Sequence, residues 1–406
     1  GAQGLFNAFW ETKSNGTSPE AFRLFNGPTA LLLKTDPAER IAVAGDTVKA
    51  AFWIAHYGSA PVENARLAWT LRAGGDVLAQ GECVGGTVEL GCTRLLAEAA
   101  VAVPSVAKPL RARLEAVLPA PGETVRNAWD LWLFPRRDKR DGRGIAVSKD
   151  LLPALEKLYA GLVPAGTPEA ESASLVVSRL GAPETRPALA AGKRLLLING
   201  AQGKPNVSLG WWGMGNQVGT AFAKHPALGE FPHEGRLSPL SFRIVKQGLR
   251  LPLKGMKPEE MLVVGEGLND FFLYAGEARV GASRALLTFG LDVLSGTPEG
   301  ACLLDGLVRY ARSDAFNPQG AVEPPAAARN GWQETVKAGD AGFEDLPFGT
   351  VQLDIARAGR PPRAGLENAA AQNHRQRFQQ PPLDRRFRNV LNRRLTLFTP
   401  HNRCRS

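Results

Sequence analysis

Hydrophobic and polar residues alternate along residues 36–135, and this period of two predicts β-strands. The alternation is clearest over three segments, residues 47–54, 65–71 and 110–117. Gly74-Gly75 joins the second segment to residues 77–80 as a hairpin, and the apolar segment 127–135 ends at a proline. Turn residues recur at the spacing typical of a β-sandwich. We therefore predict an all-β domain over 36–135, with Trp53, Trp69, Trp129 and Trp132 in its core.

The pattern changes over residues 147–320, where continuous apolar runs alternate with helical spacing. The runs at 195–200, 261–266 and 285–290 are typical of strands covered on both faces. Residues 151–162 and 297–313 carry helical apolar spacing, and Thr297 followed by Pro298 is a good helix start. Alternating strands and helices predict a doubly wound α/β domain with a mainly parallel sheet.

Three further segments lie outside these two domains. Residues 1–35 contain a helix that Ser18-Pro19-Glu20 starts and Gly27-Pro28 ends, and they resemble the end of something larger. Residues 136–146 are a charged linker, interpreted as a solvated connection rather than a phosphate or nucleic-acid patch. Residues 321–406, rich in Pro, Arg and Gln, are predicted to be disordered, unless they are translated beyond a frameshift.

Aromatic residues and glycines are concentrated in residues 209–235. One interpretation is a loop that covers the core with its tryptophans. The other is a carbohydrate platform, in which indole faces stack on sugar rings while amides bond the hydroxyls. The platform residues would be Trp211, Trp212, Asn216 and Gln217. The segment follows a predicted strand, and ligands of open α/β sheets bind beyond strand carboxyl ends, which favours the platform.

The formal net charge is +10. Residues 357–406 carry twelve Arg against Glu367 and Asp384, so this segment alone supplies the excess. No nucleic-acid partner is therefore expected. No apolar run is long enough to span a membrane, and no signal peptide is recognisable. The start, GAQGLFNAFWE, reads as the interior of a folded protein, so we expect a truncation.

The motifs of nucleotide binding, zinc peptidases and nucleophile elbows are missing, and no cofactor is expected. His225 and His233, with Glu230 and Glu234 nearby, do not have a standard metal-ligand spacing, so no metal site is predicted. Asp270 and Asp292 follow apolar strands, where structural roles are favoured over an acid–base pair.

The chain has four cysteines, Cys83, Cys92, Cys302 and Cys404, without a CxxC motif. Cys83 and Cys92 flank a Gly-Gly turn. They are expected to be free thiols, with a hairpin disulfide as the alternative.

Several segments together resemble the C-terminal part of β-galactosidase-like enzymes of glycoside hydrolase family 2. LFNAFWETKSNGTSPEAFRLFNGPTALLL (5–33) resembles the end of the family's (β/α)₈ barrel. VKAAFWIAHYGSAPVENARLAWTLR and NAWDLWLFP resemble the Ig-like sandwich that follows. LGWWGMGNQVGTAFAKHPALGEFPHEG, GEGLNDFFLYAGEARVG and LLTFGLDVLSGTPEGACLLDGLVRYA resemble the C-terminal α/β domain, which we expect to be flavodoxin-like.

The resemblance implies a secreted or periplasmic parent enzyme that cleaves O-glycosidic bonds of polysaccharides with two barrel glutamates. Those glutamates would lie upstream of this chain, and Glu11 is not assigned their role. The chain would then be an accessory region, inactive alone, with a polysaccharide and the barrel of its own longer chain as partners. The alternatives are a stand-alone carbohydrate-binding or assembly module and, less favoured, an independent α/β hydrolase or amidotransferase.

Overall fold

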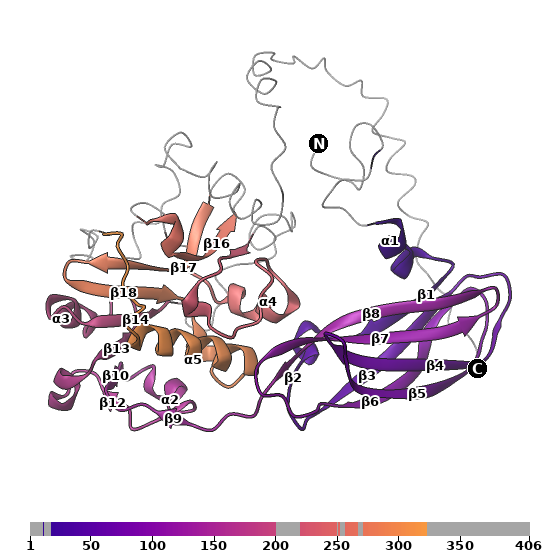
Figure 1. The fold of residues 1–406 in the computed structure, drawn as a ribbon, viewed down its shortest axis with the longest axis horizontal. Coiled ribbons are helices and arrows are strands. Elements are labelled where there is room, and N and C mark those ends of the chain that lie inside the picture. Colours follow the sequence, from indigo (N-terminus) through magenta and orange to yellow (C-terminus); the bar gives the residue numbers. More distant parts are fainter. Residues whose placement is uncertain are drawn as a thin grey trace, which may run out of the picture. The chain divides into compact units, whose positions relative to one another are not determined.

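A computed structural model describes residue 11 and residues 18–199, 220–249, 251, 256–266 and 271–322. The fold is mixed α/β and rich in strands, with a β-rich part followed along the chain by an α/β part (Figure 1). No helix within the described ranges is long and apolar enough to cross a membrane. The predicted tail falls outside them except for residues 321–322, which lie beside Arg279 at the end of a strand.

The β-rich part consists of two sheets that share one core. The first has the order β1 (Thr29–Lys34), β3 (Thr47–His56), β6 (Cys92–Ala102). The second has the order β2 (Ile41–Val43), β8 (Glu123–Phe134), β7 (Leu110–Ala120), β4 (Val62–Ala73), β5 (Asp76–Val88). All pairings are antiparallel except β2 with β8. Because β1 pairs with β3, the β-rich part starts before the predicted boundary at residue 36.

The alternation predicted for these strands is confirmed by burial. On β4, Leu67, Trp69 and Leu71 point into the core while Arg66 and Ala68 are exposed. The opposite sheet contributes Phe52, Ile54 and other side chains to the same core. Trp129 packs against this core, whereas Trp132 is buried in the core of the α/β part. Trp53 is only half-buried, with the Lys34 ammonium 5.0 Å from its ring centre.

The α/β part is built on one eight-stranded sheet. Its order is β12 (Val163–Pro164), β10 (Ile145–Val147), β13 (Leu175–Ser178), β14 (Arg194–Ile198), β18 (Ser283–Thr288), β17 (Phe271–Val280), β16 (Met261–Glu266), β15 (Ala221–Phe222). The five strands from β12 to β18 are parallel, and the remaining three are antiparallel. The sheet is therefore mixed rather than mainly parallel.

Residues 261–266 illustrate why the sequence did not predict the direction of each strand. These residues form a buried strand, as expected, but β16 pairs antiparallel with β17, which we did not predict. A strand covered on both faces has the same apolar run in either direction, so composition cannot reveal its orientation.

Helices cover both faces of the parallel strands. The helices of this part are α2 (Leu152–Leu155), α3 (Thr185–Ala190), α4 (Pro239–Lys246) and α5 (Pro298–Arg312), whereas α1 (Pro19–Asn26) packs against β1 and β8 of the β-rich part. Ile145 and Val147 of β10 join the core that contains α5, whereas Ala146 joins the smaller core beside α3. Single turns of 3₁₀ helix occur at Pro37–Arg40, Pro168–Ser172, Pro226–Leu228, Pro258–Glu260 and Leu291–Leu294.

The two predicted helix starts are confirmed, and one predicted helix is wrong. The hydroxyl of Ser18 accepts from the Ala21 amide at 3.1 Å, and that of Thr297 accepts from the Gly300 amide at 3.2 Å. Residues 151–162 contain only the one-turn α2, after which β11 (Tyr159–Ala160) pairs with β9 (Arg140–Asp141). Leu151, Leu155 and Tyr159 are buried at helical spacing, but the chain reaches these positions through a turn and a strand.

The β-rich and α/β parts share buried side chains. Trp132 and Phe134, at the end of β8, belong to the same core as Leu303 and Leu307 of α5. The predicted linker contributes ion pairs here, since Arg137 and Arg140 contact the buried carboxylate of Asp305 at 3.3 and 3.0 Å. The linker is therefore partly anchored rather than only solvated.

Candidate functional site at the carboxyl edge of the sheet

The order of the parallel strands defines a switch point. The chain passes from β10 outward to β12 and then returns to β13 on the other side of β10. Ligands of open α/β sheets bind outside the carboxyl ends of strands at such a point. Ser148 follows β10, Arg179 follows β13, Asn199 follows β14 and Thr288 ends β18. We call these four residues, with Asp150 and Asp292, the carboxyl-edge site.

Arg179 is the central charge of this site. Its Nε donates to Asp150 Oδ2 at 2.5 Å, and its Nη2 donates to Asp292 Oδ2 at 2.6 Å. Burial lowers the pKa of the guanidinium, but the hydrogen bonds to Asp292 and Asp150 outweigh it, so the pKa is raised. Arg179 therefore stays charged and holds two carboxylates that come from different loops.

Hydrogen bonds fix the strand ends around Arg179. The hydroxyls of Ser178 and Thr185 are 2.7 Å apart, and Thr185 also donates to the carbonyl of Arg179 at 2.8 Å. Asn199 Oδ1 accepts from the Leu180 amide at 2.9 Å, and the backbone N–H of Asn199 donates to the carbonyl of Thr288. β13, β14 and β18 are thereby held in register up to the site.

Several polar atoms at the site are buried and have no hydrogen-bond partner among the described residues. They are Ser148 Oγ, Arg179 Nη1, Asn199 Nδ2, Thr288 Oγ1 and Asp292 Oδ1. A buried group left unpaired costs roughly 1–3 kcal/mol, so such atoms are uncommon in folded proteins. Ten further atoms of this kind lie elsewhere in the described residues. The switch point and the two ion pairs of Arg179 are therefore what mark this edge as a candidate site.

The predicted carbohydrate residues lie beyond the described ranges. Trp211, Trp212, Asn216 and Gln217 fall between Asn199 and Thr220, as part of a segment for which the structure gives no account. Asp270 is also outside the described residues. Asp292 is described, and its carboxylate forms an ion pair with Arg179.

The two histidines considered as metal ligands make separate local contacts. His225 Nδ1 accepts from the Ala227 amide at 3.2 Å, and His233 Nδ1 accepts from the Gly235 amide at 3.3 Å. Glu234 pairs with Arg111 and Arg236. Among the described residues, no group of three or more His, Cys, Asp or Glu side chains is arranged to hold a metal ion.

Cys83, Cys92 and Cys302 are free thiols. The Cys83 thiol donates to the Glu98 carbonyl at 3.5 Å, and the Cys92 thiol to the Glu89 carbonyl at 3.1 Å. The free state expected for Cys83 and Cys92 is confirmed, and their alternative disulfide is not formed. Cys404 lies outside the described part of the chain.

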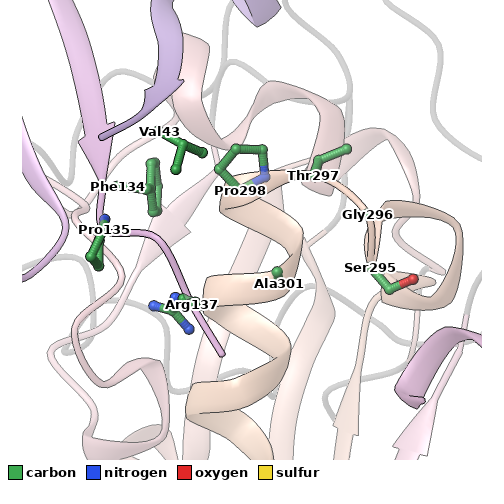
Figure 2. Close-up of a pocket in the computed structure, with 9 residues that line it drawn as sticks. All are labelled: Val43, Phe134, Pro135, Arg137, Ser295, Gly296, Thr297, Pro298 and Ala301. Atoms are coloured by element: carbon green, nitrogen blue, oxygen red, sulfur yellow. The ribbon is translucent and has the colours of Figure 1, made fainter. Parts of the chain in front are cut away.

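A pocket of about 160 Å³ lies where the end of β8 meets the start of α5. Figure 2 shows Val43 and Phe134 of the β-rich part opposite Pro298 and Ala301 of α5. The charged residue of its lining is Arg137, which already pairs with Asp305. The pocket is largely apolar, and we regard it as a packing space at the junction rather than as the candidate site.

The carboxyl-edge residues other than Asp292 were not singled out from the sequence. Asn199 and Thr288 lie inside the apolar runs 195–200 and 285–290 of the sequence analysis, which gives Arg179 no role. The available signal is positional, because Ser148 and Asn199 each directly follow a short apolar run. Without the strand order, nothing indicated that these runs end side by side.

Comparisons with known proteins leave the family open. Residues 46–135 match a domain of unknown function, DUF8488. No curated protein matches the chain.

Three solved structures are examples of proteins to which parts of this chain are distantly similar. The alkylpurine DNA glycosylase AlkC of Pseudomonas fluorescens, solved with DNA containing an abasic site analogue, is 13% identical over 28% of this chain and 32% of its own, with a TM-score of 0.20. The sporulation control protein Spo0M of Bacillus subtilis is 11% identical over 32% and 54%, with a TM-score of 0.20. A family 123 glycoside hydrolase of Clostridium perfringens is 10% identical over 37% and 38%, with a TM-score of 0.20. Scores this low carry no argument about fold or function.

Proposed function

We propose that this chain is an accessory region of a glycoside hydrolase that acts on O-glycosidic bonds of polysaccharides. In this proposal the β-rich part is an Ig-like sandwich, and the α/β part is a doubly wound, flavodoxin-like domain extended by antiparallel strands. The family resemblance of residues 5–316 supports it, as does the parallel strand order β12-β10-β13-β14-β18, which matches the flavodoxin-like order 2-1-3-4-5. The parent protein would be secreted or periplasmic.

The observation that carries the proposal is the shared core of the two parts. Trp132 and Phe134 of β8 are 3% and 1% exposed, and they pack with the buried face of α5. Asp305, which is also buried, receives Arg137 and Arg140 from the connecting segment. Parts that share buried side chains and ion pairs in this way suit a scaffold that holds a neighbouring domain or a glycan in place.

The proposed glycan contacts are Trp211, Trp212, Asn216 and Gln217. They belong to the segment that begins directly after Asn199, at the carboxyl edge of the sheet. Indole faces bury the apolar face of a sugar ring, and amide groups both donate to and accept from hydroxyls. The polysaccharide and the catalytic barrel of the same longer chain are the proposed partners.

The test uses the complete chain, with soluble galactomannan and xylan as probes. We expect no release of reducing sugar, together with saturable binding in affinity electrophoresis. The double variant Trp211→Ala/Trp212→Ala should weaken that binding by about tenfold or more, because stacking contacts contribute about 0.5–1.5 kcal/mol each and two mid-range contacts together exceed the roughly 1.4 kcal/mol of a tenfold change. Tyr57→Ala is the matched control, since Tyr57 is an exposed aromatic residue of the β-rich part.

Two results would contradict the proposal. Turnover of either polysaccharide by the complete chain would show that it is an enzyme in its own right. Equal binding by wild type and the double tryptophan variant would remove the proposed glycan contact.

The second candidate function is a stand-alone carbohydrate-binding or assembly module. The switch point of the parallel strands favours it, because ligands of open α/β sheets bind at such a point without any contribution from a barrel. Joining the chain to a catalytic barrel separates the two proposals. An accessory region should raise the barrel's activity on polysaccharide relative to its activity on a small aryl glycoside. An independent module should leave that ratio unchanged.

A further inference from the structure

Three guanidinium groups gather around one buried carboxylate beside α5. The side chain of Asp305 is 3% exposed, and its Oδ2 lies 3.3 Å from Arg137 Nη1. Arg140 Nε is 3.0 Å from Oδ1 of the same carboxylate, and Arg309 Nε is 3.2 Å from Oδ2. Figure 2 shows Arg137 beside α5. We call these three arginines the arginine cluster, which holds three positive charges around one negative charge.

The neighbouring charges do not balance this excess. Arg312, three residues after Arg309 on α5, donates to the backbone carbonyls of Asp141 and Arg143 at 3.4 and 3.0 Å. The Asp141 carboxylate is already paired with Arg143 at 2.8 Å. Arg312 therefore adds a further positive charge that no carboxylate of the described residues pairs with.

The remaining acidic groups near the cluster are few. Asp138 and Lys139 are adjacent in the sequence and cancel each other in charge. A Cβ at Gly229 would lie 3.8 Å from Arg309 Nη2, which places the next residue, the exposed Glu230, near the cluster. With Arg312 and Glu230 included, four guanidiniums face two carboxylates. The positive excess is therefore a property of this place in the fold.

The guanidiniums of Arg140 and Arg309 are fixed in position but keep unused donors. Each contacts Asp305 through Nε, and no other described residue accepts a hydrogen bond from their Nη atoms. Their side chains are 53% and 44% exposed, so these nitrogens are open to solvent. Guanidinium groups bind carboxylates through two parallel hydrogen bonds. Because buried Asp305 already orders both side chains, binding an anion would cost less conformational entropy here than at free arginines.

The size of the charge excess indicates which anion the cluster suits. DNA carries one negative charge per roughly 1.7 Å of helix, and a protein that binds it needs a long basic surface. Outside residues 357–406 the positive and negative side chains of this chain balance, so the excess at the cluster is local. An acidic polysaccharide carries its carboxylates singly on separate sugar residues, which matches a local excess.

We propose that the arginine cluster binds the carboxylate of a uronic acid residue in a polysaccharide. Arg140 and Arg309 donate to the carboxylate from their exposed Nη atoms, and Asp305 holds them in place from the buried side. This inference rests on the proposed function and specifies an acidic glycan as a ligand of the same chain.

The test uses the complete chain and measures each arginine separately. Residues 357–406 carry twelve Arg, so total binding of an acidic glycan would not report on the cluster alone. Phenylglyoxal modifies exposed guanidinium groups, and mass spectrometry of peptides locates each modified arginine. Trigalacturonate should slow the modification of Arg140 and Arg309, whereas the exposed Arg66 and Arg113 of β4 and β7 should keep their rates.

Two matched ligands define what is recognised. The methyl ester of trigalacturonate has the same sugars without the charges, and it should not protect the cluster. Inorganic phosphate has the charge without the sugar, and at the same concentration it should protect less than trigalacturonate does.

Arg309→Lys separates the planar guanidinium from its charge. Lysine keeps a positive charge beside Asp305, so the variant should melt close to wild type, but an ammonium group cannot bind a carboxylate through a planar pair of donors. The trigalacturonate concentration that half-protects Arg140 should rise about tenfold, because one hydrogen bond to a charged group accounts for roughly that factor. Arg113→Lys is the matched control and should leave this concentration unchanged.

Four results would each overturn the inference. They are no protection of Arg140 and Arg309, equal protection by the methyl ester, equal protection by inorganic phosphate, and an unchanged half-protecting concentration in Arg309→Lys. Equal protection by phosphate would mean that the cluster is a general anion site.

Failure of this inference is distinguishable from failure of the proposed function. If trigalacturonate gives no protection but galactomannan binding is lost in Trp211→Ala/Trp212→Ala, the uronic acid site is wrong and the proposed accessory function stands. If trigalacturonate protects the cluster but the complete chain hydrolyses polysaccharide, the accessory role is wrong and the uronic acid site stands.

Discussion

Charged residues in this protein are used largely to join elements that are distant in the sequence. Asp305 of α5 is a clear case, because its carboxylate is only 3% exposed and accepts the Tyr159 hydroxyl at 2.7 Å. Burial is the main cause that raises the pKa of this tyrosine, and the neighbouring Asp305 charge adds to it. Arg137, Arg140 and Arg309 surround the same carboxylate. The Asp305 carboxylate therefore ties β11 and the connecting segment to α5.

His233 gives a pH-dependent prediction. Burial, and then the Lys224 charge, lower its pKa below the usual 6.5, so the folded state favours the neutral ring. Below pH 6.5 the unfolded chain binds the proton more readily than the folded chain. The stability contributed by neutral His233 should therefore be complete above pH 6.5 and should be lost as pH falls through the lower folded pKa.

Urea unfolding at about pH 7.5 and about pH 5 checks this prediction. His233→Asn, which keeps an acceptor for the Gly235 amide, should lose less stability between the two conditions than wild type does. An equal loss in both proteins would mean that His233 does not contribute to the pH dependence.

At the scale of the helix, replacing two glycines of α5 by alanine should change the stability of the protein in opposite directions. A Cβ at Gly300 would lie 2.2 Å from the Leu294 carbonyl oxygen, whereas a Cβ at Gly306 would have no atom closer than 3.5 Å. Alanine in a helix is favoured over glycine by about 0.5–1 kcal/mol. Gly306→Ala should therefore stabilise the protein by up to about 1 kcal/mol, and Gly300→Ala should destabilise it by roughly 1–3 kcal/mol.

Chemical denaturation of both variants provides the comparison, and each serves as the control for the other. Because both residues lie on the same helix, a general effect of helix propensity would move them in the same direction. Stabilisation by Gly300→Ala would contradict the close packing of Leu294 against the start of α5.

The sequence predicted elements well where local chemistry and burial agree. Thr297, Pro298 and the apolar spacing after them specify α5 completely, and the alternating residues of β3, β4 and β7 specify strands. It failed at residues 151–162, where burial at helical spacing arises from a turn followed by a short strand. It also missed β17 and the direction of β16, because pairing partners are set by tertiary contacts.

The candidate site could be predicted only in outline. The general position, beyond the carboxyl ends of the strands, followed from the α/β pattern. The residues did not, because Arg179, Asn199 and Thr288 come from three strands whose neighbours are fixed by the strand order. Their burial and unpaired atoms are properties of packing, which a single sequence does not contain.

For the whole molecule, the shared core predicts cooperative unfolding. Phe134, 1% exposed at the end of β8, belongs to the core of the α/β part. Phe134→Ala should destabilise the protein by about 3–5 kcal/mol, and it should lower the unfolding midpoints of both parts together. Hydrogen exchange at peptides from β4 and β14 reports on each part separately.

The matched control is Phe25→Ala, the same substitution on α1 at a side chain that is 59% exposed. It should change stability by no more than about 0.5 kcal/mol. If Phe134→Ala accelerates exchange in β14 but leaves β4 unchanged, the two parts unfold independently.

The position of β18 between β14 and β17 has a consequence for synthesis on the ribosome. Arg194 of β14 pairs with Arg284 of β18, so the strand that completes the parallel half of the sheet emerges about ninety residues later. At a synthesis rate of roughly 5–20 residues per second, one edge of β14 stays unpaired for roughly five to twenty seconds. During that time the nascent chain presents a strand edge able to pair with a wrong partner. Production of this protein should therefore depend on chaperones that cover this edge until β18 has emerged.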